Sequence, residues 1–281
     1  MFERRLGLFP TSFTSDGQMF CNTYLGDYPQ FAPGSQKNPA ANNSPGWMLL
    51  SYDKPAQASS ALENFPVKNA FDEDIRTWWS AASGKEGEWL QVDLGKLCRI
   101  EAVQINFADQ GMTNLGRLEN DSYRYYVQIS NDGEIWKTCL DRRNNLRDSP
   151  HDYTQLNEPA MARYVRLVNV HTPSGGLFSV SGFRIFGSGL GKAPNRVKTV
   201  EAVRNISDPR QVQVSWQPVK NADFYIIRYG IAHDRLFNNY QAYKTNRLEI
   251  NSLNIGVSYY FTVDAVNDSG ITKGTKILFA K

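Results

Sequence analysis

Short alternating runs of hydrophobic and polar residues recur along the chain. The second half of residues 100–107 alternates, so that Val103, Ile105 and Phe107 fall on one side of an extended segment, as in a half-buried strand. The odd-numbered residues of 259–265 are hydrophobic in the same way. Further strands are expected at residues 89–94, 163–170 and 183–186. Because long stretches with helical hydrophobic spacing are missing, the pattern predicts an all-β protein.

A hairpin is expected near the middle of the chain. The run 125–130 is followed by Asn131, Asp132 and Gly133, and a second run resumes at 135–136. An Asp-Gly step favours a tight turn between antiparallel strands, because glycine adopts positive φ at little cost. The aromatic content of 12% agrees with a protein built mainly from strands.

Two segments rich in small and polar residues divide the chain. Residues 32–46 and 187–195 consist largely of Pro, Gly, Asn, Ser and Ala, which is typical of linkers. With 281 residues, the chain has the length of roughly two domains. We therefore expect an N-terminal extension and linker at 1–46, a domain at 47–187, a linker at 188–194 and a second domain at 195–281.

The charge and hydrophobicity of the chain exclude two classes of protein. The net charge of +3, from 31 basic and 28 acidic residues, gives no concentrated basic surface for nucleic acid. No uninterrupted hydrophobic run exceeds about four residues, whereas a transmembrane helix needs ~20. The N-terminal residues lack the hydrophobic stretch of a signal peptide. The protein is therefore expected to be cytosolic, or to be a fragment whose natural start lies upstream.

The sequence contains no recognisable catalytic motif. His151, His171 and His233 lie on separate segments, and the three cysteines lack the spacing of metal ligands. Neither a Gly-x-Ser-x-Gly nor a His-Glu-x-x-His motif is present. The adjacent carboxylates Glu73 and Asp74 cannot readily flank a glycosidic bond at the ~5–9.5 Å separation of a catalytic pair. We therefore expect this chain not to be an enzyme.

Four blocks of residues carry a resemblance to a known family. In order, they are 66–80 (PVKNAFDEDIRTWWS), 87–95 (GEWLQVDLG), 126–136 (YVQISNDG with Trp136) and 162–167 (ARYVRL). They resemble the coagulation factor 5/8 type C, or discoidin, domain, the group that includes the family 32 carbohydrate-binding modules. The resemblance implies a jelly-roll β-sandwich at 47–187 with ligand-binding loops at one end.

A tight turn in the first of these blocks offers oxygen atoms to a metal. Asp72 and Asp74 flank one residue and Thr77 follows, and calcium is bound by such carboxylate, carbonyl and hydroxyl oxygens. In similar modules, residues that match Asn69, Asp72, Asp74 and Thr77 surround a structural calcium ion. The glutamate that often closes the site falls near Ser181 here, so one carboxylate is lost. The alternative is a solvated acidic turn capped by its own backbone.

The resemblance also places a saccharide-binding surface on the loops. A sugar is bound by an aromatic platform beside planar donors such as Arg and Asn. Trp79 matches the core tryptophan of the family, so Trp78, which points the opposite way in an extended segment, is expected to be the platform. Arg117 and Asn120 match positions that hold sugar hydroxyls in family 32 modules, and Phe178 matches a second aromatic residue.

A second polar cluster lies in one loop. It consists of Arg142, Arg143, Asn144, Arg147, His151 and Asp152. Among these, Arg142, Asn144 and His151 are further candidate saccharide ligands. The Pro-His-Asp-Tyr turn around His151 is equally consistent with an internal hydrogen-bonded brace.

Residues 195–281 resemble a fibronectin type III domain. The motifs are 212–218 (VQVSWQP), 222–229 (ADFYIIRY) and the spacing of Leu253, Gly256 and Tyr259. The resemblance implies that Trp216 lies in the core and that the Tyr259 hydroxyl ties a connection to the backbone, the tyrosine corner. Because no Arg-Gly-Asp stretch is present, a spacing or docking role is expected.

The N-terminal segment has a third resemblance. Residues 6–10, 16–20 and 26–29 are similar to the last propeller strands of bacterial family 43 glycoside hydrolases, which act on xylan and arabinan side chains. The similarity implies that the parent protein is an exported enzyme with its catalytic domain upstream. In a fragment, this propeller remnant must dock onto the neighbouring sandwich or stay loose.

Together these observations predict a non-catalytic module that targets an attached polysaccharide-degrading glycoside hydrolase to its glycan, for example a plant cell-wall polysaccharide. The localisation expected for such a bacterial protein is secreted, periplasmic or cell-surface. One alternative is a membrane-surface or cell-adhesion protein, which would use Met112, Leu115 and Leu118 in the long loop. Another is a pair of structural spacer domains.

Overall fold

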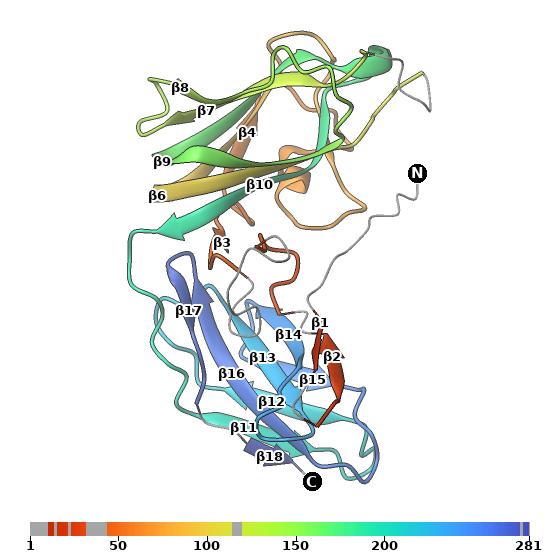
Figure 1. Ribbon diagram of the computed structural model, residues 1–281, viewed down its shortest axis with the longest axis vertical. Helices are drawn as coiled ribbons and strands as arrows, with labels where there is room; N and C mark the ends of the chain where they lie inside the picture. Colours follow the sequence, from red (N-terminus) through yellow and green to blue (C-terminus); the bar gives the residue numbers. More distant parts are fainter. Residues whose placement is uncertain are drawn as a thin grey trace. The chain divides into compact units, whose positions relative to one another are not determined.

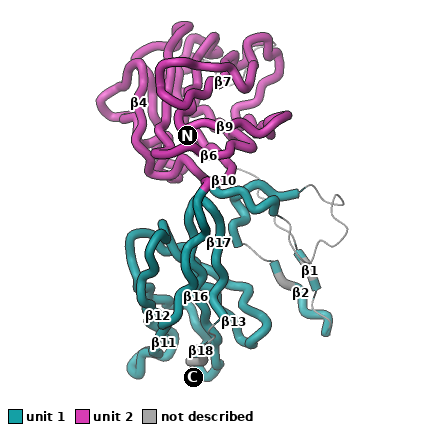
Figure 2. Tube along the Cα trace, turned by 90° about the vertical axis from the view of Figure 1, so that its left-hand side faces the viewer, with its two compact units in different colours: residues 1–48, 191–281 teal, residues 49–190 magenta. Residues whose placement is uncertain are grey.

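The computed structural model describes residues 11–13, 16–21, 24–31, 44–113, 120–275 and 278–280. The chain forms two compact units (Figure 2). Residues 49–190, magenta in Figure 2, are called the first unit below, and residues 1–48 with 191–281, teal in Figure 2, are called the second unit. Within the described residues, no helix has both the length and the hydrophobicity needed to span a bilayer.

Eight strands and two short 3₁₀ helices build the first unit (Figure 1). They are β3 (Met48–Leu49), β4 (Ala56–Ala58), η1 (Val67–Ala70), β5 (Trp79–Ser80), β6 (Trp89–Phe107), β7 (Arg124–Ser130), β8 (Lys137–Asp141), β9 (His151–His171), η2 (Pro173–Gly175) and β10 (Ser179–Gly189). The strand order is β3-β10-β6-β9-β7-β8, with β4 paired to β6 and β5 paired to β10.

The long strands β6 and β9 run through both layers of a sandwich. Their pairing is interrupted between Asp93 and Cys98. Before the break, β6 pairs with β4 and with β9, and this part of β9 also pairs with β7. After the break, β6 pairs with β10. Fully buried core side chains include Trp79, Leu90, Ile105, Val127, Phe178 and Phe183. The expected β-sandwich is confirmed.

Three loops leave this sandwich at the same end. Asn106 pairs with His151, so the end of β6 lies beside the start of β9. Arg124 pairs with His171, so the start of β7 lies beside the end of β9. Because β8 runs back along β7, it also ends here. The described parts of the loop 108–123 are therefore neighbours of the loops 142–150 and 172–178.

The second unit contains two more sheets, which enclose a common core. One sheet contains β11 (Val200–Arg204), β12 (Val212–Trp216) and β15 (Arg247–Ile250), and the other contains β13 (Phe224–Gly230), β14 (Asn238–Tyr243), β16 (Tyr259–Asn267), β17 (Gly270–Thr272) and β18 (Leu278–Ala280). Trp216 is buried in this core beside Tyr225. The Tyr259 hydroxyl accepts a hydrogen bond of 3.2 Å from the Asn254 N–H, so the expected tyrosine corner is present.

The N-terminal segment packs against the second unit's sandwich. It forms a hairpin of β1 (Thr11–Phe13) and β2 (Met19–Cys21), and Leu25 and Tyr28 are buried. The Tyr24 hydroxyl donates to Asp264 at 3.1 Å, and Asp16 forms an ion pair with Arg235. The segment was expected to dock onto the neighbouring sandwich or to stay loose; these contacts show that it docks on the sandwich of residues 191–281, which does not follow it directly in the sequence. Residues 6–10 of the propeller resemblance lie outside the described residues.

Candidate functional site

A polar pocket lies where the 142–150 loop meets β9. It has a volume of about 520 Å³ and is lined by Asp141, Arg142, Asn144, Asn145, Arg147, Ser149, Asp152 and Tyr153. Every lining residue carries a side-chain group that can form hydrogen bonds. The loop is short and polar, so its side chains surround an open hollow rather than a hydrophobic core.

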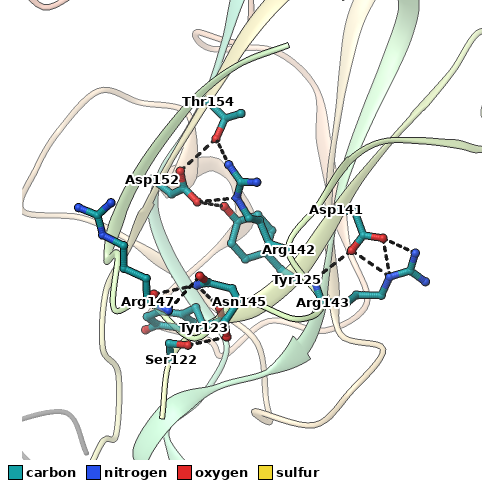
Figure 3. A network of polar contacts seen from close by, with 10 residues as sticks. All are labelled: Ser122, Tyr123, Tyr125, Asp141, Arg142, Arg143, Asn145, Arg147, Asp152 and Thr154. Atoms are coloured by element: carbon teal, nitrogen blue, oxygen red, sulfur yellow. Dashed lines mark hydrogen bonds and ion pairs between the residues drawn. The ribbon is translucent and has the colours of Figure 1, made fainter. Parts of the chain in front are cut away.

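Arg142 is fixed by partners on both neighbouring strands (Figure 3). Its backbone N–H donates to the Tyr125 carbonyl at 2.9 Å, and its guanidinium donates to Asp152 at 3.3 Å and to Thr154 at 2.9 Å. The Tyr125 hydroxyl also donates to Asp152, at 2.6 Å. Burial raises the pKa of the Tyr125 phenol, so this hydroxyl stays protonated. Arg142 and Asp152 therefore form part of the pocket wall.

A second ion pair lies at the end of β8. Arg143 pairs with Asp141 through two guanidinium nitrogens. These hydrogen bonds lower the pKa of Asp141 to about 2, so its carboxylate stays charged above this pH. Both side chains are about half exposed, so this pair contributes little to stability. Its effect on the pocket is to balance the charge of Asp141.

Asn145 fixes the backbone of the loop. Its side-chain amide donates to the carbonyl oxygens of Tyr123 and Arg147, and its side-chain oxygen accepts the Arg147 N–H. The Ser122 hydroxyl donates to the Asn145 carbonyl at 2.8 Å. Asn145 thus acts as an internal brace, although it also lines the pocket.

Asn144 and Arg147 are among the donor side chains of the pocket that remain available. Among the described residues, the side chains of Asn144 and Arg147 have no hydrogen-bond or ion-pair partner, and both residues are exposed. In Figure 3 the Arg147 guanidinium points away from the other labelled residues. Tyr153 is 45% exposed and adds an aromatic ring to the lining. The pocket therefore combines an amide, a guanidinium and a ring.

The predicted saccharide ligands lie in several places. Arg142 and Asn144 are brought together in the pocket. His151 is hydrogen-bonded through Nδ1 to the Asn106 side chain at 3.1 Å, which agrees with the predicted brace. Asn120 is exposed in the left-handed conformation with φ 64, and Arg117 lies outside the described residues.

The two predicted aromatic platforms differ in their exposure. Phe178 is completely buried and packs edge-on against Trp79, with 5.7 Å between the ring centroids. The prediction that Phe178 presents a ring to a sugar is therefore wrong, because its ring belongs to the core. Trp78 is half-buried, stacks on Phe65 at 4.8 Å and donates from Nε1 to Gln110 at 3.1 Å. One of its faces is thus already covered.

Sequence reasoning missed Tyr153, Asp141, Asn145 and Ser149 as lining residues. The first of these follows His151 by two positions in β9, and alternate residues of a strand share a face. This spacing was the available signal. The fold of the 142–150 loop, which turns Arg147 outward, left no comparable pattern in the sequence.

The predicted metal turn is occupied by its own hydrogen bonds. One Asp72 carboxylate oxygen accepts the Asp74 N–H at 2.9 Å, and the other accepts the Thr77 hydroxyl at 2.7 Å. The Asp74 carboxylate is bound by the Arg76 guanidinium, which lowers the pKa of Asp74 to about 2. The Asn69 amide donates to the Trp78 carbonyl. These contacts match the alternative of an acidic turn capped by the protein itself.

The residues near the missing glutamate position do not complete a calcium site. The Ser181 hydroxyl donates to the Asn106 carbonyl at 3.2 Å. A Cβ atom at Gly182 would lie only 2.8 Å from the Asn106 side-chain nitrogen. The Asn106 amide therefore occupies the space that the side chain of a closing glutamate would need. The cationic Arg184 pairs with Glu73 in the same turn. In the described residues, no group of three or more His, Cys, Asp or Glu side chains is arranged for a metal.

Calcium therefore stays a prediction: the ion takes roughly six to eight oxygens, and the Asp72 and Asp74 carboxylates already accept hydrogen bonds from the protein. We expect the melting temperature of the first unit to change by less than about 1 °C between millimolar calcium and excess EDTA, because only binding to the folded state stabilises it. Differential scanning calorimetry of the full chain measures this. A rise of several degrees in the melting temperature with calcium, but not with magnesium, would show that the domain binds a structural calcium ion.

Both sandwiches match known domain families. Residues 55–183 match the F5/8 type C domain, and residues 195–281 match the fibronectin type III domain. Lactadherin from Mus musculus is 32% identical over 98 residues, which cover 33% of this chain and 20% of lactadherin. Lactadherin from Sus scrofa is 29% identical over 100 residues, which cover 33% of this chain and 23% of the relative. The chain thus spans about a fifth of these relatives.

Several solved structures are similar to about half of this chain. Chitosan-binding module 1 from a chitosanase/glucanase of Paenibacillus sp. IK-5 has 25% identity and a TM-score of 0.43, and the match covers 50% of this chain and 99% of the module. CpGH89CBM32-6 from Clostridium perfringens has 21% identity and a TM-score of 0.40, with 50% and 100% covered. From the two family matches and the two sandwiches, the chain carries an F5/8 type C (discoidin) domain followed by a fibronectin type III domain.

Proposed function

We propose that the discoidin domain binds a saccharide in the pocket between the 142–150 loop and β9. The observation that supports this most strongly is the lining. It holds an exposed amide on Asn144 and an exposed guanidinium on Arg147, neither of which is used by the described part of the protein. The surrounding ion pairs and the Asn145 brace fix the wall behind them.

The chemistry of this lining suits a sugar. Hydroxyl groups on a pyranose ring both donate and accept hydrogen bonds, and the Asn144 amide offers both functions. The Arg147 guanidinium donates through a planar fork. The half-exposed Tyr153 ring supplies the apolar surface that the C–H face of a sugar requires. A mostly hydrophobic ligand would leave these donors unpaired.

The double substitution Asn144→Ala and Tyr153→Ala tests the proposal. We expect it to weaken retention on an immobilised polysaccharide or oligosaccharide at least about tenfold, since loss of an aromatic contact and a hydrogen bond together is worth more than ~1.4 kcal/mol. Affinity electrophoresis over a panel of glycans measures the change. Tyr240→Ala is the matched control, because this tyrosine of the fibronectin type III domain is 41% exposed.

Equal retention of wild type and double variant on every glycan that binds would reject the pocket. Failure of the wild type to bind any glycan, together with cosedimentation with phosphatidylserine vesicles, would favour the membrane-surface alternative. Of the apolar loop residues which that alternative needs, Met112 is described, whereas Leu115 and Leu118 lie outside the described residues.

We further propose that the domain brings an attached polysaccharide-degrading glycoside hydrolase to its substrate in an exported bacterial protein. A binding module raises the local concentration of a catalytic domain on a polymer even when its own affinity is weak. The sequence contains no recognisable catalytic motif, so in this proposal the catalytic residues belong to the attached hydrolase. The reading frame upstream of the gene segment tests it, because an encoded propeller domain is expected there.

A further inference from the structure

We infer that the pocket selects a saccharide that carries a carboxylate, and that Arg147 is the residue that selects it. This inference rests on the proposed function, because it names the class of sugar that the same pocket accepts. Arg147 thus has a role in ligand binding, although its side chain stabilises neither the fold nor the pocket wall.

The charge balance of the pocket points to an anionic ligand. Four ionisable residues with permanent charge line it, namely Asp141, Arg142, Arg147 and Asp152. Asp152 is neutralised by Arg142, at 3.3 Å, and Asp141 is neutralised by Arg143, which stands outside the lining. The positive charge on Arg147 is the one left uncompensated among these groups. The adjacent Asp148 does not line the pocket.

The position of Arg147 is prepared before any ligand binds. Asn145 holds both the N–H of Arg147, at 3.1 Å, and its carbonyl, at 2.8 Å. Asn145 is held in turn by Tyr123 and Ser122, which precede β7. The Arg147 side chain therefore starts from a fixed backbone, which lowers the entropy lost when the guanidinium is immobilised. Figure 3 shows the guanidinium directed away from this brace.

A carboxylate fits this guanidinium better than a hydroxyl does. Two parallel N–H groups of an arginine bind both oxygens of a carboxylate, and these charge-assisted hydrogen bonds are roughly twice as strong as neutral ones. A lysine would supply the charge without the planar fork. With Asn144 and Tyr153 on the ring of the same sugar, the expected ligand is a uronic acid residue within an oligosaccharide.

The experiment compares three probes with the full chain: a trigalacturonate, the corresponding neutral trigalactose and a sulfated galactose oligosaccharide. We expect the wild type to bind the carboxylated probe about tenfold more tightly than the neutral one, as measured by isothermal titration calorimetry. Arg147→Gln should remove this preference, because it should weaken binding of the carboxylated probe about tenfold more than binding of the neutral probe. The preference should also fall as sodium chloride is raised, because the site is open to solvent.

Arg99→Gln is the matched control, because Arg99 is a half-exposed arginine of the same domain that is paired with Glu101 and does not line the pocket. Arg147→Lys should give an intermediate preference. If the neutral probe binds as well as the carboxylated one, or if Arg147→Gln changes nothing, the inference is wrong although the pocket still binds sugar. If the sulfated probe is preferred, the carboxylate assignment is overturned. If no probe binds and Asn144→Ala with Tyr153→Ala has no effect on any glycan, the proposed function itself fails.

Discussion

Replacement of Asp264 by alanine is expected to lower the free energy of unfolding of the fibronectin type III domain by about 3–5 kcal/mol. The Asp264 side chain is completely buried, and Arg228 binds both of its oxygens, at 2.8 and 3.0 Å. The Gly274 N–H and the Tyr24 hydroxyl donate to the same carboxylate. Without Asp264, a largely buried guanidinium, an N–H group and a phenol would all lose their acceptor.

Chemical denaturation of the full chain followed by tryptophan fluorescence measures this loss, because the transition that exposes Trp216 reports on this domain. Trp216 is the one tryptophan in residues 191–281. Asp234→Ala is the control, because Asp234 is an exposed carboxylate of the same domain. Tyr24→Phe should have a smaller effect of about 1 kcal/mol, since it removes one hydrogen bond. Equal stability of the Asp264 and Asp234 variants would show that the buried ion pair contributes nothing.

The regular part of the fold could be predicted from local patterns. The alternation of Val103, Ile105 and Phe107 reflects side chains that are buried on one face of β6, and the Asn-Asp-Gly sequence marks the turn between β7 and β8. The Tyr259 hydroxyl reaches Asn254, only five residues away. These features depend on neighbours in sequence, so the sequence displays them directly.

Contacts between distant residues could not be predicted in the same way. Tyr24 and Asp264 are separated by 240 positions and by the whole discoidin domain. Neither residue carries a pattern that identifies the other, since a tyrosine and an aspartate occur on most surfaces. The docking of the N-terminal segment on the C-terminal sandwich could therefore be found from the structure but not from the sequence.

The site was predictable in composition but not in geometry. The density of Arg, Asn and Asp in 142–152 indicated a polar cluster, and Arg142 and Asn144 indeed line the pocket. Which arginine stays available depends on how the loop closes, because Arg142 turns to Asp152 and Arg143 to Asp141. For Phe178, an aromatic residue before the last strand is compatible with both a surface platform and a core position, and only burial distinguishes them.

Phe178→Ala is expected to destabilise the discoidin domain by about 3–5 kcal/mol, because the substitution leaves a cavity in a close-packed core. The Phe178 ring is completely buried and packs against Trp79 and Phe107, with centroids 5.7 and 6.2 Å away. For a domain of this size, such a loss lowers the melting temperature by roughly 10 °C. Scanning calorimetry of the full chain measures the transition. Ile135→Ala is the control, since Ile135 is 78% exposed.

The same variant separates a core residue from a ligand residue. At a temperature where the Phe178→Ala protein is still folded, saccharide affinity should remain within about twofold of wild type, because the pocket around Arg147 contains no part of Phe178. Phe178→Leu, which keeps most of the volume, should recover much of the lost stability. A variant that melts like wild type but no longer retains glycan would show instead that the ring contacts the sugar, which requires the 172–178 loop to open in solution.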